Sequence, residues 1–279
     1  MKTKLRLISF VFLAVIFTQL SCGFCKSAPS YIVVYGDSRT NHAVHKEIVK
    51  AIMKYKPKIV FHTGDMIDTH RDDWTIFNEI TSELRKTAEF YPALGNHEYY
   101  GGLNVFADNF ELPNNEQWYS VEREGAHFII LNSYTRIDES SEQYAWLESD
   151  LKNIGKNIKF TIVFFHHPPF SSHFTPTENW KPLVDAVVPL FEKYGVDIVF
   201  NGHVHAYERC LHNNIYYITT GGGGAPLHPS GEKNPYSQKY IATYNFCLLH
   251  IEGNQLFIEV LDKDLKSLDE FSITCRSHK

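Results

Sequence analysis

The feature that most constrains the fold of this chain is the alternation of short, apolar, β-rich runs with helical stretches. Examples of these runs, which are rich in β-branched and aromatic residues, are Tyr31–Tyr35, Lys58–His62, Phe160–Phe165 and Asp197–Phe200. Runs without regular polar alternation are typical of strands buried on both faces. The pattern therefore predicts an α/β fold with mixed sheets inside and helices outside.

Helices and antiparallel strands are predicted between and after these runs. One helix is indicated by the apolar residues Val44, Ile48 and Ile52, which are spaced four apart. Another is predicted over Ser141–Ile154, with Ser140 and Gln143 as a capping box and Gly155 as its stop. A more antiparallel set is predicted at Gln117–Glu124, Ala126–Asn132, Asn214–Thr219 and Tyr240–Glu259.

The bulk composition predicts one domain over residues 29–279. The chain is 43% hydrophobic and 21% charged, which is enough apolar material for one sizeable core, and no linker-like stretch interrupts it. The formal net charge is −5, and no block of Lys or Arg stands out after the first residues. No nucleic-acid partner is therefore expected.

Residues 1–23 have the pattern of a secretory signal peptide. Lys2, Lys4 and Arg6 precede an apolar run, Leu7–Leu20, that is shorter than the about 20 residues of a membrane span. Small residues follow the run and offer a cleavage site. Cys22 is alternatively the lipidated cysteine of a lipoprotein, so we expect export, either secreted or periplasmic, with or without a membrane anchor.

The cysteine pattern leaves disulfide pairing open. The five cysteines are Cys22, Cys25, Cys210, Cys247 and Cys275. An exported protein permits disulfides, but the sequence does not choose among the pairings. None of the spacings is typical of a zinc finger.

Five short segments each place a metal-competent side chain directly after a predicted strand. They are Gly36-Asp37-Ser38-Arg39, Gly64-Asp65-Met66-Ile67-Asp68, Gly95-Asn96-His97-Glu98, His166-His167-Pro168-Pro169 and Gly202-His203-Val204-His205. Carboxylate, amide and imidazole ligands together suit Mn, Fe or Zn. Each segment alone has an ordinary structural explanation, but five in this order indicate a metal site. The remaining histidines, apart from His173, are expected to be ordinary surface or core residues, His228 among them.

This ordered set resembles the signature of the calcineurin-like metallophosphoesterases. The resemblance implies a four-layer α/β/β/α sandwich and two transition-metal ions as cofactors. Carried over motif by motif, the implied ligands are Asp37 and His205 for the first metal, Asp65 bridging both, and Asn96, His166 and His203 for the second. His97 stands where the family places a residue that protonates the leaving oxygen or stabilises the phosphate. His167 is expected to support the site or to pack beside it.

Other segments resemble the purple acid phosphatase branch. They are His166–Phe170, Ala206–Arg209 and the glycine-rich Thr219–Pro226. His173 follows the fourth motif, near where some plant members carry substrate-facing histidines. Arg39 stands where many members of the superfamily have a histidine. It is either a loop arginine in an ion pair or, as we favour, a residue that binds a phosphate oxygen. Asp68 stands where purple acid phosphatases have the tyrosine that binds ferric iron, so no purple colour is expected. Asp68 is a candidate either for a metal ligand or for a residue that supports the ligands.

The resemblance implies a phosphoesterase that hydrolyses small phosphomonoesters by attack of a metal-activated hydroxide, and residues 1–23 predict that it is exported. A phosphodiesterase acting on cyclic nucleotides or other diesters is the alternative, because both share the motifs. A non-catalytic binding module would be expected to lack ligands, and no serine or cysteine nucleophile motif is present. Specificity is expected in the loops Ile67–Trp74, His173–Trp180 and Gly221–Pro235. Trp74, Trp180, Tyr99 and Tyr100 are candidates either for the pocket wall or for packing.

Overall fold

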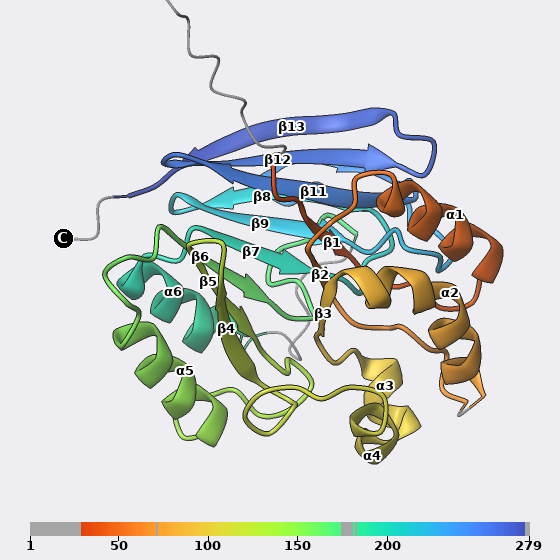
Figure 1. Ribbon diagram of the computed structural model, residues 1–279. Helices are drawn as coiled ribbons and strands as arrows, with labels where there is room; N and C mark the ends of the chain where they lie inside the picture. Colours follow the sequence, from red (N-terminus) through yellow and green to blue (C-terminus); the bar gives the residue numbers. More distant parts are fainter. Residues whose placement is uncertain (1–28, 71, 174–180, 182, 277–279) are drawn as a thin grey trace, which may run out of the picture.

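Two mixed β-sheets stack face to face in the computed structural model, with helices on both outer sides (Figure 1). The structure describes residues 29–276 apart from 71, 174–180 and 182. The predicted signal peptide, Cys22, Cys25 and the candidate pocket residue Trp180 therefore lie outside the described residues. Among the helices that are described, none combines the length and the apolar character needed to cross a membrane.

The first sheet has six strands in the order β13-β12-β11-β1-β2-β3. Their bounds are β1 Ile32–Tyr35, β2 Ile59–His62, β3 Glu89–Pro92, β11 Asn245–Glu252, β12 Gln255–Asp262 and β13 Ser267–Thr274. Strands β1, β2 and β3 are parallel, whereas β11, β12 and β13 are added antiparallel. The parallel strands thus end at the same edge of the sheet.

The second sheet has seven strands in the order β10-β8-β9-β7-β6-β5-β4. Their bounds are β4 Tyr119–Arg123, β5 Ala126–Ile130, β6 Phe160–Phe164, β7 Ile198–Asn201, β8 Tyr207–His212, β9 Ile215–Thr220 and β10 Ser237–Ile241. Strands β5, β6, β7 and β9 are parallel to one another, and the pairings of β4 with β5, β8 with β9 and β10 with β8 are antiparallel.

The helices form the two outer layers (Figure 1). Their bounds are α1 His42–Met53, α2 Asp73–Thr87, α3 Asn96–Gly101, α4 Leu103–Ala107, α5 Glu142–Lys152 and α6 Val188–Tyr194, the last preceded by a π-helical turn at Leu183–Val187. Apolar residues of α1 and α2 pack on the first sheet, and those of α5 and α6 pack on the second. The four-layer α/β/β/α prediction is therefore confirmed.

Strand β1 shows why the sequence runs are continuously apolar. Ile32 and Val34 face the core between the sheets, while Val33 and Tyr35 face the helical layer. Successive strand side chains point to opposite faces, so a strand covered on both sides has no exposed position for a polar residue. The predicted burial of such strands on both faces is confirmed.

Several predicted boundaries differ from the structure. The segment Tyr240–Glu259 contains the end of β10, all of β11 and most of β12, with a turn at Gly253. The capping box at Ser140 is wrong: Ser141 caps α5, and its side chain accepts from the backbone N–H of Tyr144. Gln143 instead bonds to the backbone of Asn132, because that group is buried beside it.

Candidate metal centre

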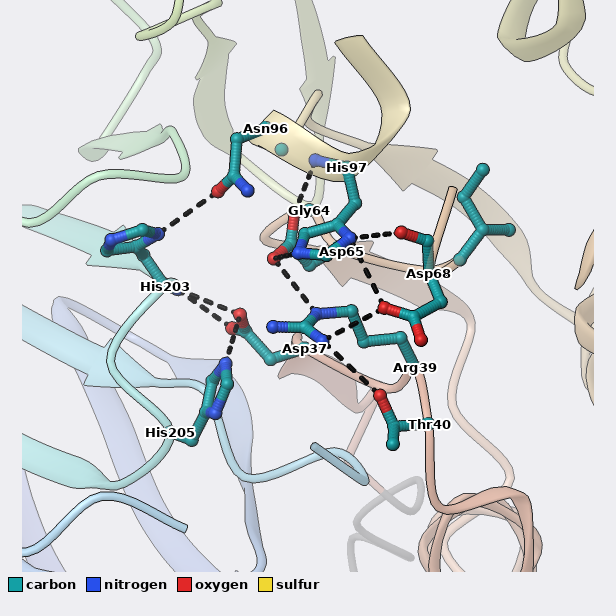
Figure 2. A network of polar contacts seen from close by, with 12 residues as sticks. Asp37, Arg39, Thr40, Gly64, Asp65, Asp68, Asn96, His97, His203 and His205 are labelled. Atoms are coloured by element: carbon teal, nitrogen blue, oxygen red, sulfur yellow. Dashed lines mark hydrogen bonds and ion pairs between the residues drawn. The ribbon is translucent and has the colours of Figure 1, made fainter. Parts of the chain in front are cut away.

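The carboxyl ends of five strands bring the motif residues to one place between the two sheets. The residues are Asp37 after β1, Asp65 after β2, Asn96 after β3, His166 after β6, and His203 and His205 after β7. Figure 2 shows the side chains of Asp37, Asp65 and His203 converging. This is the edge at which open α/β sheets place their functional residues.

Three of these residues have a backbone conformation that is rare for side chains other than glycine. The backbone φ is 55° at Asp37, 58° at Asp65 and 65° at His203. A non-glycine residue in this region costs about 1–3 kcal/mol and persists only where the surrounding structure holds it. Such strain clusters at functional sites, so its coincidence with three predicted ligands supports a functional reading of the turns.

Glycines leave room for the two central carboxylates. A Cβ atom on Gly202 would lie 2.5 Å from Asp37 Oδ2, and one on Gly95 would lie 2.2 Å from Asp65 Oδ1. Both distances are far below van der Waals contact. The glycine in these motifs is therefore required by the close approach of the carboxylates.

Asp37, Asp65 and His205 form the first group of donor atoms, all within 4.8 Å of one another. His205 Nε2 lies 3.5 Å from Asp37 Oδ1. His205 Nδ1 donates to the carbonyl oxygen of Pro226 at 2.6 Å, which leaves Nε2 to face the carboxylates. Orientation of a ligating imidazole by a hydrogen bond from its other nitrogen is usual in metal sites.

Asn96, His166 and His203 converge in the second group. Asn96 Oδ1 lies 3.1 Å from His166 Nε2 and 3.1 Å from His203 Nδ1. His166 Nδ1 donates to the carbonyl oxygen of Thr63 at 2.8 Å, which fixes the direction of its ring. A nitrogen of His167 also lies within 4.8 Å of its counterparts on His166 and His203, while its Nδ1 bonds Ser133 Oγ at 2.9 Å.

The donor set fits two transition-metal ions. Buried carboxylates, an amide oxygen and imidazoles oriented toward common points match the ligand preferences of Mn, Fe and Zn. Asp65 joins the two groups, since its Oδ1 lies 3.4 Å from His166 Nε2 while the carboxylate belongs to the first group. A carboxylate in this position is able to contact both ions.

Asp65 and His166 set the electrostatic field of the site. Burial lowers the pKa of His166, but the negative charges of Asp65 and Asp37 outweigh it and raise that pKa to about 9. Burial raises the pKa of Asp65, but His166 and His97 together hold it well below its usual range. Burial and the charge of His166 lower the pKa of His203 to about 3. The carboxylates thus create a field that favours a cation among these imidazoles.

Arg39, Asp68 and His97 form a network beside the donor groups (Figure 2). The Arg39 guanidinium donates to Asp65 Oδ2 at 3.3 Å and to Asp68 Oδ1 at 3.2 Å. His97 Nδ1 donates to the backbone carbonyl oxygen of Asp68, and its Nε2 lies 3.7 Å from Asp65 Oδ2. Asp68 is not one of the three donors clustered in the first group, and its side chain is 50% exposed.

Glu98 holds the turns that carry the ligands. Its buried carboxylate accepts from the backbone N–H groups of Asp65, Met66, Ile67 and Gly95 at 2.7–3.2 Å. Burial and the negative charge of Asp65 raise the pKa of Glu98 to about 7, and the N–H groups of Gly95 and Asp65 oppose this rise. One side chain therefore connects the second and third motifs.

A stack of three imidazoles extends from the first group. The ring of His228 lies 4.0 Å from that of His205 and 4.4 Å from that of His173, nearly parallel to both. The backbone N–H of His205 also donates to His228 Nδ1 at 3.2 Å. His173 is thereby connected to the site through His228.

The structure brings together the six residues that the family resemblance implies as metal ligands, with Arg39, Asp68 and His97 beside them. The role of the six residues as ligands stays a prediction. Sequence reasoning missed His228, which was expected to be an ordinary histidine and instead stacks on His205. It also missed Glu98, although the motif contained it and an acid two residues after a predicted ligand was a usable signal. Trp74 is a packing residue, since it is buried among Phe77, Phe106 and Phe110.

A two-sheet α/β sandwich with these two donor groups defines the class of metallophosphoesterases. Residues 30–207 match the family model described as Calcineurin-like phosphoesterase, and the chain belongs to this family. Purple acid phosphatase 15 of Arabidopsis thaliana is 32% identical over 182 residues, which cover 56% of this chain and 33% of that protein. The chain thus spans about a third of that relative.

Solved structures agree on the fold. The purple acid phosphatase PPD1 of yellow lupin superposes with a TM-score of 0.78 at 22% identity, covering 89% of this chain and 54% of that one. GAP50, the anchor in the inner membrane complex of Plasmodium, superposes with a TM-score of 0.75 at 18% identity, covering 90% of both chains. At these identities the likeness concerns the fold alone.

Proposed function

We propose that this chain is an exported phosphoesterase with a dinuclear metal centre that hydrolyses phosphomonoesters, as an acid phosphatase does. The observation that carries the proposal is the pair of donor groups that share Asp65, with Arg39 and His97 beside it. The sequence similarity to purple acid phosphatases supports the same activity.

The proposed ligands fall into two sets. The first metal would be held by Asp37, Asp65 and His205, and the second by Asp65, Asn96, His166 and His203. When bound, two such ions lower the pKa of a coordinated water and neutralise phosphoryl oxygens. We propose that Asp68 acts through Arg39 and His97, which it contacts, since it lies at the edge of the first group.

The network beside the donors would bind the phosphate and assist the leaving group. Arg39 presents a planar guanidinium next to the Asp65 carboxylate, a geometry suited to a phosphate oxygen. The backbone carbonyl of Asp68 keeps a proton on Nδ1 of His97, so the protonated imidazole carries its second proton on Nε2. That proton is placed for transfer to the leaving oxygen. His173, held through His228, would contact the substrate from the side of the first group.

Metal reloading tests the proposal directly. Mature protein is stripped of metal and reloaded with Mn, Fe or Zn, the metal content is measured, and hydrolysis of p-nitrophenyl phosphate is compared with that of bis-p-nitrophenyl phosphate. We expect metal-dependent turnover of the monoester. Turnover of the diester alone would replace the proposal with the phosphodiesterase alternative. No turnover of either substrate with two metals bound would contradict both activities.

Variants of the ligands provide the control. Asp65→Asn and Asn96→Ala should abolish turnover and reduce bound metal while leaving the circular dichroism spectrum unchanged. Asn104→Ala, an exposed amide in α4, is the matched control and should behave like the parent protein. Full activity in both ligand variants would contradict the assignment.

Export is part of the proposal and rests on residues 1–23. Expression of the full chain in a bacterial host, followed by cell fractionation and mass determination, should reveal an exported product cleaved near Gly23. A product that begins at Cys22 and carries a lipid would instead establish the lipoprotein form. An intact product in the cytoplasm would contradict export.

A further inference from the structure

Two exposed tyrosines stand next to each other at the edge of the candidate metal centre. Among the described residues, the exposed large hydrophobic side chains are those of Tyr99, Tyr100 and Tyr236, with exposures of 38%, 68% and 36%. Tyr99 and Tyr100 belong to α3, the helix that begins with Asn96 and His97. Exposed aromatic surface is unfavourable in water, so its concentration beside a site calls for an explanation.

Tyr134 joins these two residues to form a cluster that we term the tyrosine platform. The ring of Tyr134 lies 4.4 Å from that of Tyr99 and 5.5 Å from that of Tyr100, and its hydroxyl bonds the hydroxyl of Tyr100. Tyr134 belongs to the segment after β5, 34 residues from Tyr100 in sequence. Two separate segments thus supply one aromatic surface.

The tyrosine platform is continuous with the second donor group. The ring of Tyr134 lies 5.9 Å from that of His167, which in turn lies 4.7 Å from that of His203. His167 Nδ1 and Ser133 Oγ are 2.9 Å apart, which fixes the segment that carries Tyr134. The aromatic surface therefore begins beside a proposed metal ligand.

The platform also lies on the leaving-group side of the proposed reaction. His97, which we propose to protonate the leaving oxygen, precedes Tyr100 by three residues in the same short helix. Residues three apart in a helix are surface neighbours. A leaving group that departs toward His97 would thus meet the tyrosine rings.

We propose that Tyr99, Tyr100 and Tyr134 form a subsite for the planar aromatic part of the leaving group, as in a nucleoside or aryl phosphomonoester. The proposal rests on the proposed phosphoesterase function. Tyrosine rings stack on planar groups while their hydroxyls stay hydrated, which suits a half-open subsite. Such stacking does not select among bases, so the subsite favours any planar aromatic group. Nucleosides and simple aryl groups then differ only in the size of the group that stacks.

Substrate comparison tests the subsite. The kcat/KM of the metal-loaded protein is measured for adenosine 5′-monophosphate, phenyl phosphate and glycerol 3-phosphate, in the parent and in Tyr100→Ala and Tyr134→Ala. We expect each variant to lose about 5- to 100-fold on adenosine monophosphate, and a similar or smaller factor on phenyl phosphate, since one stack contributes about that much. Glycerol 3-phosphate should change by less than about twofold.

Conservative variants separate stacking from folding. Tyr100→Phe and Tyr134→Phe keep the rings and should keep most of the preference for aromatic substrates. Tyr236→Ala removes another exposed tyrosine, 36% exposed against 38% for Tyr99, that packs elsewhere, against Phe170 and His212, and it should leave the preference unchanged. An equal loss on all three substrates, or no loss on any, would overturn the proposal.

A binding measurement separates this proposal from the phosphoesterase function itself. Calorimetry with the metal-loaded protein compares adenosine 5′-monophosphate with inorganic phosphate. Tighter binding of the nucleotide that Tyr100→Ala removes would support the subsite even if nothing is hydrolysed. Equal binding of the two ligands would overturn it even if the protein is an active phosphatase. Loss of self-association in Tyr100→Ala, with substrate preference unchanged, would also overturn it by identifying a protein contact.

Discussion

Replacement of Glu98 by glutamine should destabilise the protein and weaken its metal centre. Glu98 Oε2 accepts from the N–H groups of Asp65 and Gly95, and Oε1 accepts from those of Met66 and Ile67. Glutamine has one oxygen and one NH₂ group, and an NH₂ group cannot accept. Whichever way the amide lies, two buried N–H groups therefore lose their partner.

The magnitude follows from those two lost bonds. A buried donor without a partner costs about 1–3 kcal/mol, so the two donors lost in Glu98→Gln should lower the free energy of unfolding by about 2–6 kcal/mol. Glu98→Ala removes all four bonds and should cost more. Since Glu98 holds the turn of Asp65, we also expect metal affinity to fall by about 10- to 100-fold, as for other residues that orient metal ligands.

Urea denaturation of the metal-free protein measures the stability change, and competition with a chelating dye measures metal affinity. Glu111→Gln, a surface substitution of the same type, is the control and should change the free energy of unfolding by less than about 0.5 kcal/mol. A Glu98→Gln protein as stable as this control would refute the reasoning from unsatisfied N–H groups.

Three further predictions concern acid stability, the close approach at Asp37 and phosphate binding. Burial, aided by His42, lowers the pKa of His45 to about 3, so below pH about 6.5 the unfolded chain binds a proton that the folded one does not. Between pH 7 and pH 5 the free energy of unfolding of the parent protein should therefore fall by about 2 kcal/mol more than that of His45→Gln, as measured by urea denaturation at both pH values. An equal fall in the two proteins would contradict this. Gly202→Ala should reduce bound metal, because its Cβ would lie 2.5 Å from Asp37 Oδ2; unchanged metal content in the purified variant would be evidence against that contact. Arg39→Ala should raise the KM for p-nitrophenyl phosphate by about 10- to 100-fold with metal content retained, and an unchanged KM would exclude a phosphate contact.

Much of the fold could be predicted because the necessary information is local. The run around Val34 has no polar position, and this alone indicates a strand covered on both faces. Strand β3 is indicated only by the motif that follows it and not by its own composition, since Glu89–Pro92 is a short edge strand with a charged first residue and a terminal proline. An edge strand pairs with a neighbouring strand on one side only, so it tolerates charged residues and proline that a central strand excludes.

The candidate ligands could be predicted for a related reason. Asp65, Asn96 and His203 stand in short motifs that place a turn directly after a strand. The residue type alone says whether the donor is a carboxylate, an amide oxygen or an imidazole. For Asp68 the local motif does not predict the partner of the side chain. Its sequence position leaves open a ligand or a supporting residue, and only the structure shows that its side chain bonds Arg39, 29 residues away.

The sequence by itself thus determined the alternation of buried strands and helices, the order of the motifs and the chemical type of each donor, because these depend on neighbours along the chain. Only the tertiary structure decided that His228 stacks on His205, that Glu98 bonds the turn of Asp65, and that Tyr134 meets Tyr100. Each of these contacts joins segments that are 23 or more residues apart. Their pairing depends on how the two sheets bring the strand ends together, and no local pattern records it.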